Sequence, residues 1–103
     1  MEQSVFCKTF GSYPLIRIID FLLYSRDFDY PMTEIARNAG VNFQTLKKLW
    51  PKLEKNKLIT RTRTLGGITL YKINTINPVV KKLIELNNFL CWKQTEKKEE
   101  IIV

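Results

Sequence analysis

The polar residues best suited to recognition lie within one short segment, residues 42–48. Asn42, Gln44, Thr45 and Lys48 supply amide, hydroxyl and ammonium groups that donate or accept hydrogen bonds, and Phe43 adds an aromatic ring. These side chains can recognise a partner by hydrogen bonding and apolar contact, but they include no nucleophile paired with a base. We therefore expect a binding surface here and not a catalytic centre.

Composition also disfavours catalysis and metal binding. The chain contains no His, and its two cysteines, Cys7 and Cys91, stand near opposite ends. Without imidazole and with two distant thiols, neither acid–base catalysis by His nor a tetrahedral metal site can be assembled. We expect no enzyme activity, no metal and no cofactor. The thiols are expected to be reduced and partly buried, with an intersubunit disulfide as the alternative.

The length of 103 residues indicates one domain. The longest apolar stretch, residues 15–23, contains Arg17 and Asp20 and is far shorter than the roughly 20 apolar residues of a membrane-spanning helix. Residues 1–4 lack the basic and apolar parts of a secretion signal. We expect a cytoplasmic protein without membrane contact.

The formal net charge of +7 comes from the middle of the chain. Residues 1–36 carry a net −2, residues 37–82 a net +10 with Glu54 as their one acidic side chain, and residues 83–103 a net −1. A basic block interleaved with apolar residues is typical of a folded surface that binds a polyanion such as nucleic acid. The alternative is a solvated basic face that only keeps the protein in solution.

Hydrophobic spacing and capping residues predict helices over about residues 14–23, 32–40, 42–56 and 77–92. Residues 1–12 show no clear period and are expected to form an arm or an extended segment. In the helix over 42–56, an apolar stripe recurs at helical spacing through Leu46, Leu49, Trp50 and Leu53. Pro51 is expected to bend this helix or loosen one turn, because it cannot donate a hydrogen bond to the preceding turn.

A β-hairpin is predicted after that helix. Residues 58–64 and 68–73 are rich in β-branched residues and flank Gly66-Gly67, a pair that favours a two-residue turn. This turn pairs Leu65 with Ile68, Arg63 with Leu70, and Arg61 with Lys72, which places the basic side chains on one face. Leu58, Tyr71 and Ile73 are then expected on the opposite, core-directed face.

The segment between the second and third predicted helices has the composition of a helix-turn-helix. Two helices that cross steeply through a short turn need a small residue at their contact, a Gly at the reversal and apolar residues that close the corner. Ala36, Gly40, Val41, Leu46 and Leu49 meet these needs. The sequence thus predicts a mainly α protein with a small β-hairpin (α+β), in the order helix, helix, helix, hairpin, helix.

On these residues the chain resembles the winged helix-turn-helix regulators of the MarR-like and ArsR-like kind, particularly the short forms of archaea and their viruses. The resemblance covers about residues 14–90. It rests on Thr33-Glu34-Ile35-Ala36, Ala39-Gly40-Val41-Asn42 and Thr45-Leu46, on residues 53–59, and on the Gly66-Gly67 wing turn. The chain departs from the usual pattern at Pro51 and in its short, nearly neutral wing tip.

The resemblance and the basic block together indicate a sequence-specific transcriptional regulator that binds double-stranded DNA, a homodimeric repressor associated with the nucleoid. By the resemblance, helix 42–56 enters the major groove and the wing, residues 58–73, meets the backbone or the minor groove. We expect Asn42, Phe43, Gln44, Thr45 and Lys48 to read bases. Phosphate contacts are expected from Thr33, Arg37, Lys47, Lys52, Lys55, Arg61, Arg63 and Lys72. Asn42 as a helix cap and Phe43 as a core side chain are the alternatives.

Surplus apolar surface predicts a homodimer. Val79, Leu83, Leu86 and Leu90 recur at spacings of four, three and four, and Ile16 and Ile19 belong to an apolar excess on the first helix. Part of this surface is exposed in a monomer unless the arm folds over it. We expect an N-terminal arm (1–12), a winged helix-turn-helix domain with a C-terminal dimerisation helix (13–92) and a charged tail (93–103).

Two other functions stay open. A winged helix can serve as a protein-interaction module of transcription or replication machinery, because a fold does not fix a function. A protein that coats DNA without sequence preference needs the same basic surface, but it does not need the polar set around Gln44.

Overall fold

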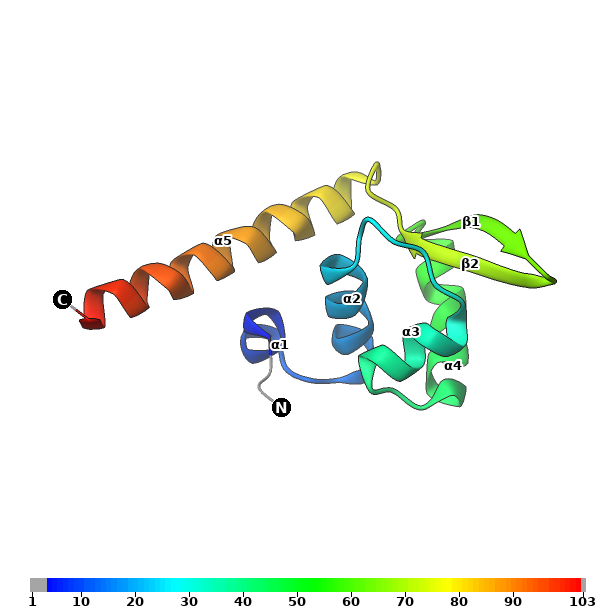
Figure 1. Ribbon diagram of the computed structural model, residues 1–103, viewed down its shortest axis with the longest axis horizontal. Helices are drawn as coiled ribbons and strands as arrows, with labels where there is room; N and C mark the ends of the chain where they lie inside the picture. The colour runs from blue at the N-terminus through cyan, green and yellow to red at the C-terminus, as the bar shows by residue number, and fades with distance from the viewer. Residues whose placement is uncertain (1–3, 103) are drawn as a thin grey trace.

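The computed structural model describes residues 4–102, with the side chains of residues 4–93. Within these residues it contains five helices and one hairpin, in the order α1 (Val5–Phe10), α2 (Pro14–Tyr24), α3 (Met32–Ala39), α4 (Phe43–Lys55), β1 (Ile59–Leu65), β2 (Ile68–Ile73) and α5 (Pro78–Ile102). Figure 1 shows α1 to α4 gathered into a helical body, from which the hairpin projects on one side and α5 on the other. The predicted class, mainly helical with a small hairpin, is confirmed.

The core is built around α2. This helix contacts α1, α3, α4 and β2, and its Ile18 and Leu23 are completely buried. The other fully buried side chains come from α3, α4 and α5: Ile35, Leu46, Leu53 and Val80. Because each helix buries one apolar face here, the opposite face of α4 is left to solvent.

The N-terminal arm differs from the prediction. Residues 5–10 form the short helix α1, and Phe6 and Cys7 are buried. Ser4 caps the helix, since its hydroxyl accepts a hydrogen bond from the Cys7 N–H at 3.1 Å. α1 contacts both α2 and α5 and so covers part of the apolar surface of these helices. This is the alternative to a dimer given above, in which the arm folds over that surface.

The last helix begins where predicted and continues further. Asn77 caps α5, because its Oδ1 accepts a hydrogen bond from the Val79 N–H at 2.8 Å. The helix passes Trp92 and runs through most of the expected charged tail to Ile102. After Lys93 the side chains of that tail lie outside the described residues. Within residues 4–102, no helix combines the length and apolarity needed to cross a bilayer.

Candidate nucleic-acid interface

The turn between α3 and α4 is set by Gly40. This residue has left-handed backbone angles (φ 69°, ψ 35°). The Gly40 N–H donates to the Arg37 carbonyl at 3.2 Å and the Val41 N–H to the Ala36 carbonyl at 2.9 Å. These two bonds form a Schellman motif, which ends α3 and redirects the chain into α4. The predicted helix-turn-helix and the role of Gly40 at its reversal are confirmed.

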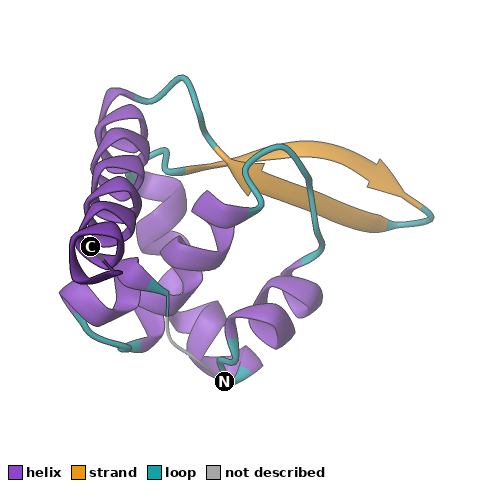
Figure 2. Cartoon of the chain, turned by 60° about the vertical axis from the view of Figure 1, so that its left-hand side comes forward, coloured by secondary structure: helices purple, strands orange, loops and turns teal. Residues whose placement is uncertain are grey.

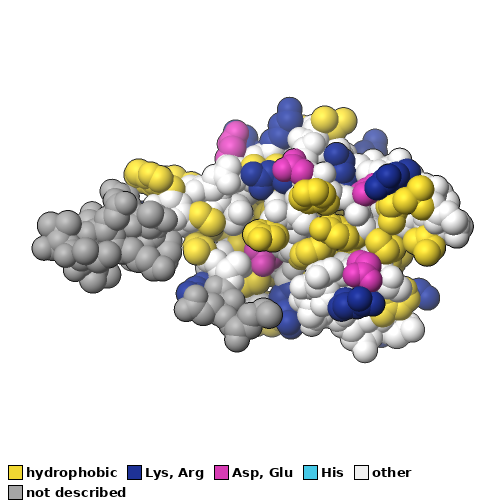
Figure 3. All heavy atoms as spheres, viewed as in Figure 1, with side chains coloured by type: hydrophobic (Ala, Val, Ile, Leu, Met, Phe, Trp, Pro, Cys, Tyr) yellow, Lys and Arg dark blue, Asp and Glu magenta, His cyan; other side chains and the backbone are white. Residues whose placement is uncertain are grey.

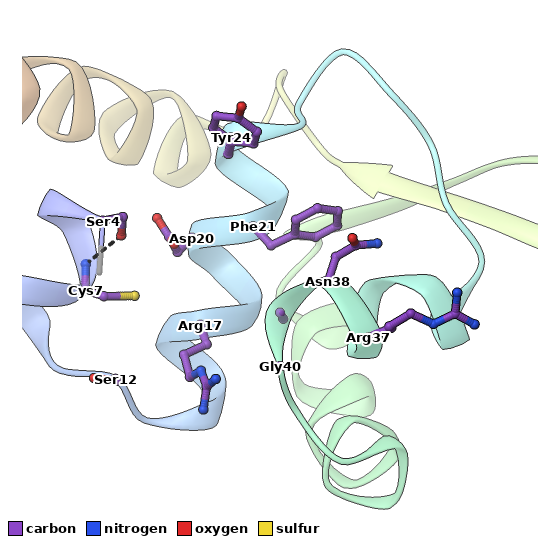
Figure 4. A pocket seen from close by; sticks show the side chains of 11 residues that line it. Ser4, Cys7, Ser12, Arg17, Asp20, Phe21, Tyr24, Arg37, Asn38 and Gly40 are labelled. Atoms are coloured by element: carbon purple, nitrogen blue, oxygen red, sulfur yellow. Dashed lines mark hydrogen bonds between the residues drawn. The ribbon is translucent and has the colours of Figure 1, made fainter. Parts of the chain in front are cut away.

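Arg17 packs against this turn from α2. A β-carbon placed on Gly40 would lie 2.4 Å from Arg17 Nη2, so the guanidinium lies directly on the glycine. Figure 4 shows Arg17 at one side of a pocket of about 550 Å³ whose lining also includes Cys7 of α1 and Asp20 of α2. The turn thus has a packed guanidinium on the side that faces α2.

The first residues of α4, and the residue before them, differ in how far they contribute to the fold. Asn42 caps the helix, because its Oδ1 accepts a hydrogen bond from the Gln44 N–H at 2.8 Å. Phe43 is half-buried and packs against the core, with Lys47 Nζ 5.7 Å from its ring centre. Thr45 is half-buried as well. The geometry therefore favours the alternatives given for Asn42 and Phe43, a helix cap and a core side chain.

The outward side of α4 is a continuous polar and basic surface. Successive residues of a helix are rotated by 100°, so the side chains on this side span an arc of about 140° around the helix axis. Lys47 lies at one edge of the arc and Lys52 at the other. Glu54 lies beside one edge of this arc and not within it. Opposite the arc, Leu46, Trp50 and Leu53 are buried, which anchors the helix to the core. The α4 face, as we call this arc, consists of Gln44, Lys47, Lys48, Pro51, Lys52 and Lys55.

Pro51 lies inside α4, which continues past it to Lys55 as predicted. The ring is exposed on the α4 face. A bend at this residue stays a prediction.

The hairpin has the predicted turn but a different register beyond it. Gly66 and Gly67 have positive φ values of 54° and 81°, which two-residue hairpin turns of this kind require. The pairs of Leu65 with Ile68 and of Arg63 with Leu70 are confirmed.

The predicted pairing of Arg61 with Lys72 is wrong. Arg61 pairs with Tyr71 because a β-bulge falls between Arg61 and Arg63, and Lys72 pairs with Thr60 instead. Since neighbouring residues of a strand point to opposite faces, the bulge places Arg61 and Arg63 on opposite faces of the hairpin. Arg61 lies over the Tyr71 ring, 5.9 Å from its centre. The single basic face expected from the sequence is therefore split.

Asp29 holds the bulge in place. Its carboxylate accepts hydrogen bonds from Arg63 Nε at 3.0 Å and Nη2 at 3.2 Å, and from the Thr62 hydroxyl. The two bonds from the guanidinium form a bidentate pair, and hydrogen bonding by Arg63 lowers the pKa of the Asp29 carboxyl. Arg63 itself is still more than half exposed.

The segment that carries Asp29 also pairs with the hairpin. Tyr30 and Tyr71 exchange two backbone hydrogen bonds of 2.8 Å, which adds a one-residue third strand at the base of the wing. No role was predicted for residues 25–31, and Asp29 was therefore missed. One signal was available: Pro31 favours an extended conformation in the residue before it, which is Tyr30.

The remaining predicted contacts are spread over α3 and the hairpin. Thr33 and Arg37 are exposed on α3, and Arg37 pairs with Glu34 at 3.1 Å. In the view of Figure 3, basic and hydrophobic side chains lie next to one another where the hairpin is. No group of three His, Cys, Asp or Glu residues that could hold a metal ion occurs in the described part of the chain.

The residues predicted for a dimer interface differ in burial. Ile16, Ile19 and Leu83 pack against the protomer's own core. Val79 and Leu86 are exposed by 57% and 37%, whereas Leu90 is half-buried. Two aromatic residues of α5 that the sequence analysis did not select are also exposed: Phe89 and Trp92, whose ring centres are 6.3 Å apart.

The two thiols differ in environment. Cys7 is buried and Cys91 is exposed, so the expectation of partial burial is wrong for Cys91. Both carry thiols in the described part of the chain, and a disulfide between subunits stays a prediction.

Comparisons with known proteins point to transcriptional regulators. No family model matches the chain. A stretch of 57 residues, 55% of the chain, is 32% identical to the HTH-type transcriptional regulator IscR of Yersinia enterocolitica. A stretch of 74 residues, 72% of the chain, is 28% identical to IscR of Photorhabdus laumondii. The chain spans less than half the length of these relatives, 35% and 45% respectively.

Solved structures show the fold. A variant of ZitR from Lactococcus lactis is similar with a TM-score of 0.64 and 16% identity, over 92% of this chain and 80% of that one. MepR, a transcription regulator of a Staphylococcus aureus efflux pump, gives 0.59 and 19%, over 84% and 61%. Sso10a-2, a DNA-binding protein from Sulfolobus solfataricus, gives 0.53 and 19%, over 82% and 88%. The chain thus has the winged helix-turn-helix fold of transcriptional regulators, as its resemblance to MarR-like proteins implied.

Proposed function

We propose that this protein is a transcriptional regulator that binds double-stranded DNA through the α4 face. The observation that carries the proposal is this face itself, which presents Gln44 and four lysines to solvent on a helix anchored by a buried stripe. An α-helix fits the major groove of B-DNA, where amide and ammonium groups can read base edges. The sequence similarity to IscR regulators supports the same conclusion.

Each side chain of the interface has a distinct role in this proposal. Gln44 is placed to form a bidentate contact with adenine, Lys48 to reach guanine acceptors, and Thr45 to contact a thymine methyl group. Asn42 and Phe43 hold the start of α4 in position. The phosphates are contacted from three elements. These contacts come from Lys47, Lys52 and Lys55 of the α4 face, from Thr33 and Arg37 of α3, and from Arg61, Arg63 and Lys72 of the wing.

The regulator acts as a homodimeric repressor in this proposal. Val79, Leu86, Phe89 and Trp92 expose apolar surface along α5, and a second copy of the chain would bury it. A two-fold dimer presents two α4 faces to two half-sites of one operator. Occupation of that operator blocks transcription without any enzymatic step, and a cytoplasmic, nucleoid-associated location follows from it.

The test starts with selection of binding sites from a random duplex library. Fluorescence anisotropy then measures affinity for the enriched duplex and for a scrambled one, at 50 and 200 mM salt. If a dimer neutralises six to ten phosphates, affinity falls by about 10³ to 10⁵-fold over this range. Gln44→Ala is expected to reduce the preference for the enriched duplex over the scrambled one. Lys55→Ala, on the same helix face, is expected to lower the affinity for both duplexes equally.

Three results would contradict the proposal in different ways. Steep salt dependence without an enriched site would show a protein that coats DNA. If Gln44→Ala and Lys55→Ala each lost the same affinity for the enriched and the scrambled duplex, α4 would not read bases. Absence of binding at 50 mM salt would point to the protein-interaction role instead.

A further inference from the structure

We propose that the tip of the hairpin is an apolar wedge, whose Leu65 and Ile68 side chains insert into the minor groove beside the site read by α4. The inference rests on the proposed function, because it adds a second contact to the same DNA-binding surface. It assigns a role to two large apolar residues that the backbone contacts do not use.

The tip is exposed and thin. Leu65 and Ile68 face each other across the turn, and their exposed fractions are 53% and 56%. A β-carbon added to Gly66 or Gly67 would meet no atom within 4 Å, so the tip has open space around it. Figures 1 and 2 both show the hairpin projecting away from the helices. Two large apolar side chains at the end of an isolated hairpin are an aggregation hazard unless a partner covers them.

The charges around the tip favour DNA as that partner. Ile59 to Ile73 contains three basic residues and no acidic one, and Asp29 of the connection after α2 pairs with one of them, Arg63. Because of the bulge, Arg61 lies on one face of the hairpin, whereas Arg63 and Lys72 lie on the other. The minor groove is a slot about 6 Å wide, with bases at its floor and phosphates along both walls. A hairpin with an apolar tip, with Arg61 on one face and Lys72 on the other, is complementary to such a slot, whereas a flat lipid surface meets cations on one face only.

The base of the hairpin is held firmly enough for insertion. The Tyr30–Tyr71 bridge and the bidentate pair of Asp29 with Arg63 tie it to the segment that follows α2. Apolar wedges of Leu or Ile in the minor groove partly unstack a base step and kink the duplex by about 20–90°. We therefore expect the wing to bend DNA next to the half-site.

The test measures unstacking directly. The duplex enriched in the selection above is prepared with 2-aminopurine in place of one adenine at a time, at steps outside the half-sites. Binding of the wild-type protein is expected to raise the fluorescence at one step, because unstacked 2-aminopurine is no longer quenched. The double variant Leu65→Ser/Ile68→Ser is expected to bind the half-site and lose this rise. Thr64→Ala/Thr69→Ala, on the opposite face of the same tip, is the matched control and is expected to keep it.

The outcomes separate this inference from the proposed function. Binding of the wild-type protein without a fluorescence change at any step overturns the wedge and leaves the proposed function in place. A rise that persists in Leu65→Ser/Ile68→Ser also overturns the wedge. Absence of binding to every duplex overturns both. Circular dichroism of the double variant checks that the fold is intact, which is expected because both side chains are largely exposed.

Discussion

At the scale of single residues, Asp29 shows how one carboxylate shapes the wing. It lies in the connection after α2, yet it binds Thr62 and Arg63, which are more than thirty positions away. These bonds stabilise the bulge that sends Arg61 and Arg63 to opposite faces. The distribution of charge over the wing therefore depends on a residue outside it.

Asp29→Asn is expected to reduce the pH dependence of stability in acid. Arg63 and Thr62 lower the pKa of this carboxyl from its ordinary value of 3.8. The stabilisation is therefore fully present above that value and is lost as the pH falls through the lower pKa of the folded state. Urea denaturation between pH 2.5 and 6 should show a smaller acid loss of the free energy of unfolding in Asp29→Asn than in wild type. Asp27→Asn, which removes the same charge from the same connection, should behave like wild type. Equal acid losses in all three proteins would show that the ion pair does not stabilise the fold.

Gly40→Ala tests the turn before α4. An alanine with φ near 69° is strained, and we expect a loss of about 1–2 kcal/mol in the free energy of unfolding. The contact with Arg17 Nη2 should add little, because the end of a long side chain can move away. The loss measured by urea denaturation should thus be the same in an Arg17→Ala background. A much smaller loss in that background would assign the effect to the steric contact instead.

At the scale of elements, α4 combines the proposed DNA-binding face with an internal proline. Pro51 has no N–H for the Lys47 carbonyl, and a proline inside a helix costs up to about 3 kcal/mol relative to Ala. Pro51→Ala is expected to raise the urea midpoint, whereas Lys52→Ala, its exposed neighbour, should change stability by less than about 0.5 kcal/mol. An unchanged or lower midpoint in Pro51→Ala would mean that the fold compensates fully for the proline.

Most elements could be predicted from the sequence because their signals are local. Pro14, Gly40, Asn42 and the Asn77-Pro78 pair act on their own turns, and Gly66-Gly67 defines the hairpin turn. The α4 face followed from the position of its apolar stripe. These features need no knowledge of distant residues.

The features that escaped prediction depend on tertiary contacts. α1 is too short to show a helical period and is stabilised by burial of Phe6. The bulge at Thr62 requires Asp29, and the burial of Phe43 requires the core beneath it. The candidate DNA-binding residues were thus identified by type, but the choice between the alternatives for Phe43 and the faces of Arg61 and Arg63 emerged only from the fold.

At the scale of the whole molecule, the proposed dimer rests on α5. Leu86→Lys/Phe89→Lys places two charges in the exposed apolar surface of this helix and is expected to yield monomers, because burying unpaired charges is costly. Sedimentation velocity at micromolar concentration should show a wild-type dimer and a monomeric variant. Tyr24→Lys changes an even more exposed aromatic residue of α2, at 87%, and should stay dimeric. A monomeric wild-type protein would contradict the proposed dimer.

Because the two thiols differ in burial, we expect them to react with thiol reagents at different rates. Cys7 lies on α1, and its burial raises the pKa of its thiol, so little of the reactive thiolate forms there, whereas Cys91 is exposed. In excess thiol reagent, we expect Cys91 to be modified rapidly and Cys7 slowly. The slow phase of modification would thus report on how tightly α1 packs against α2 and α5.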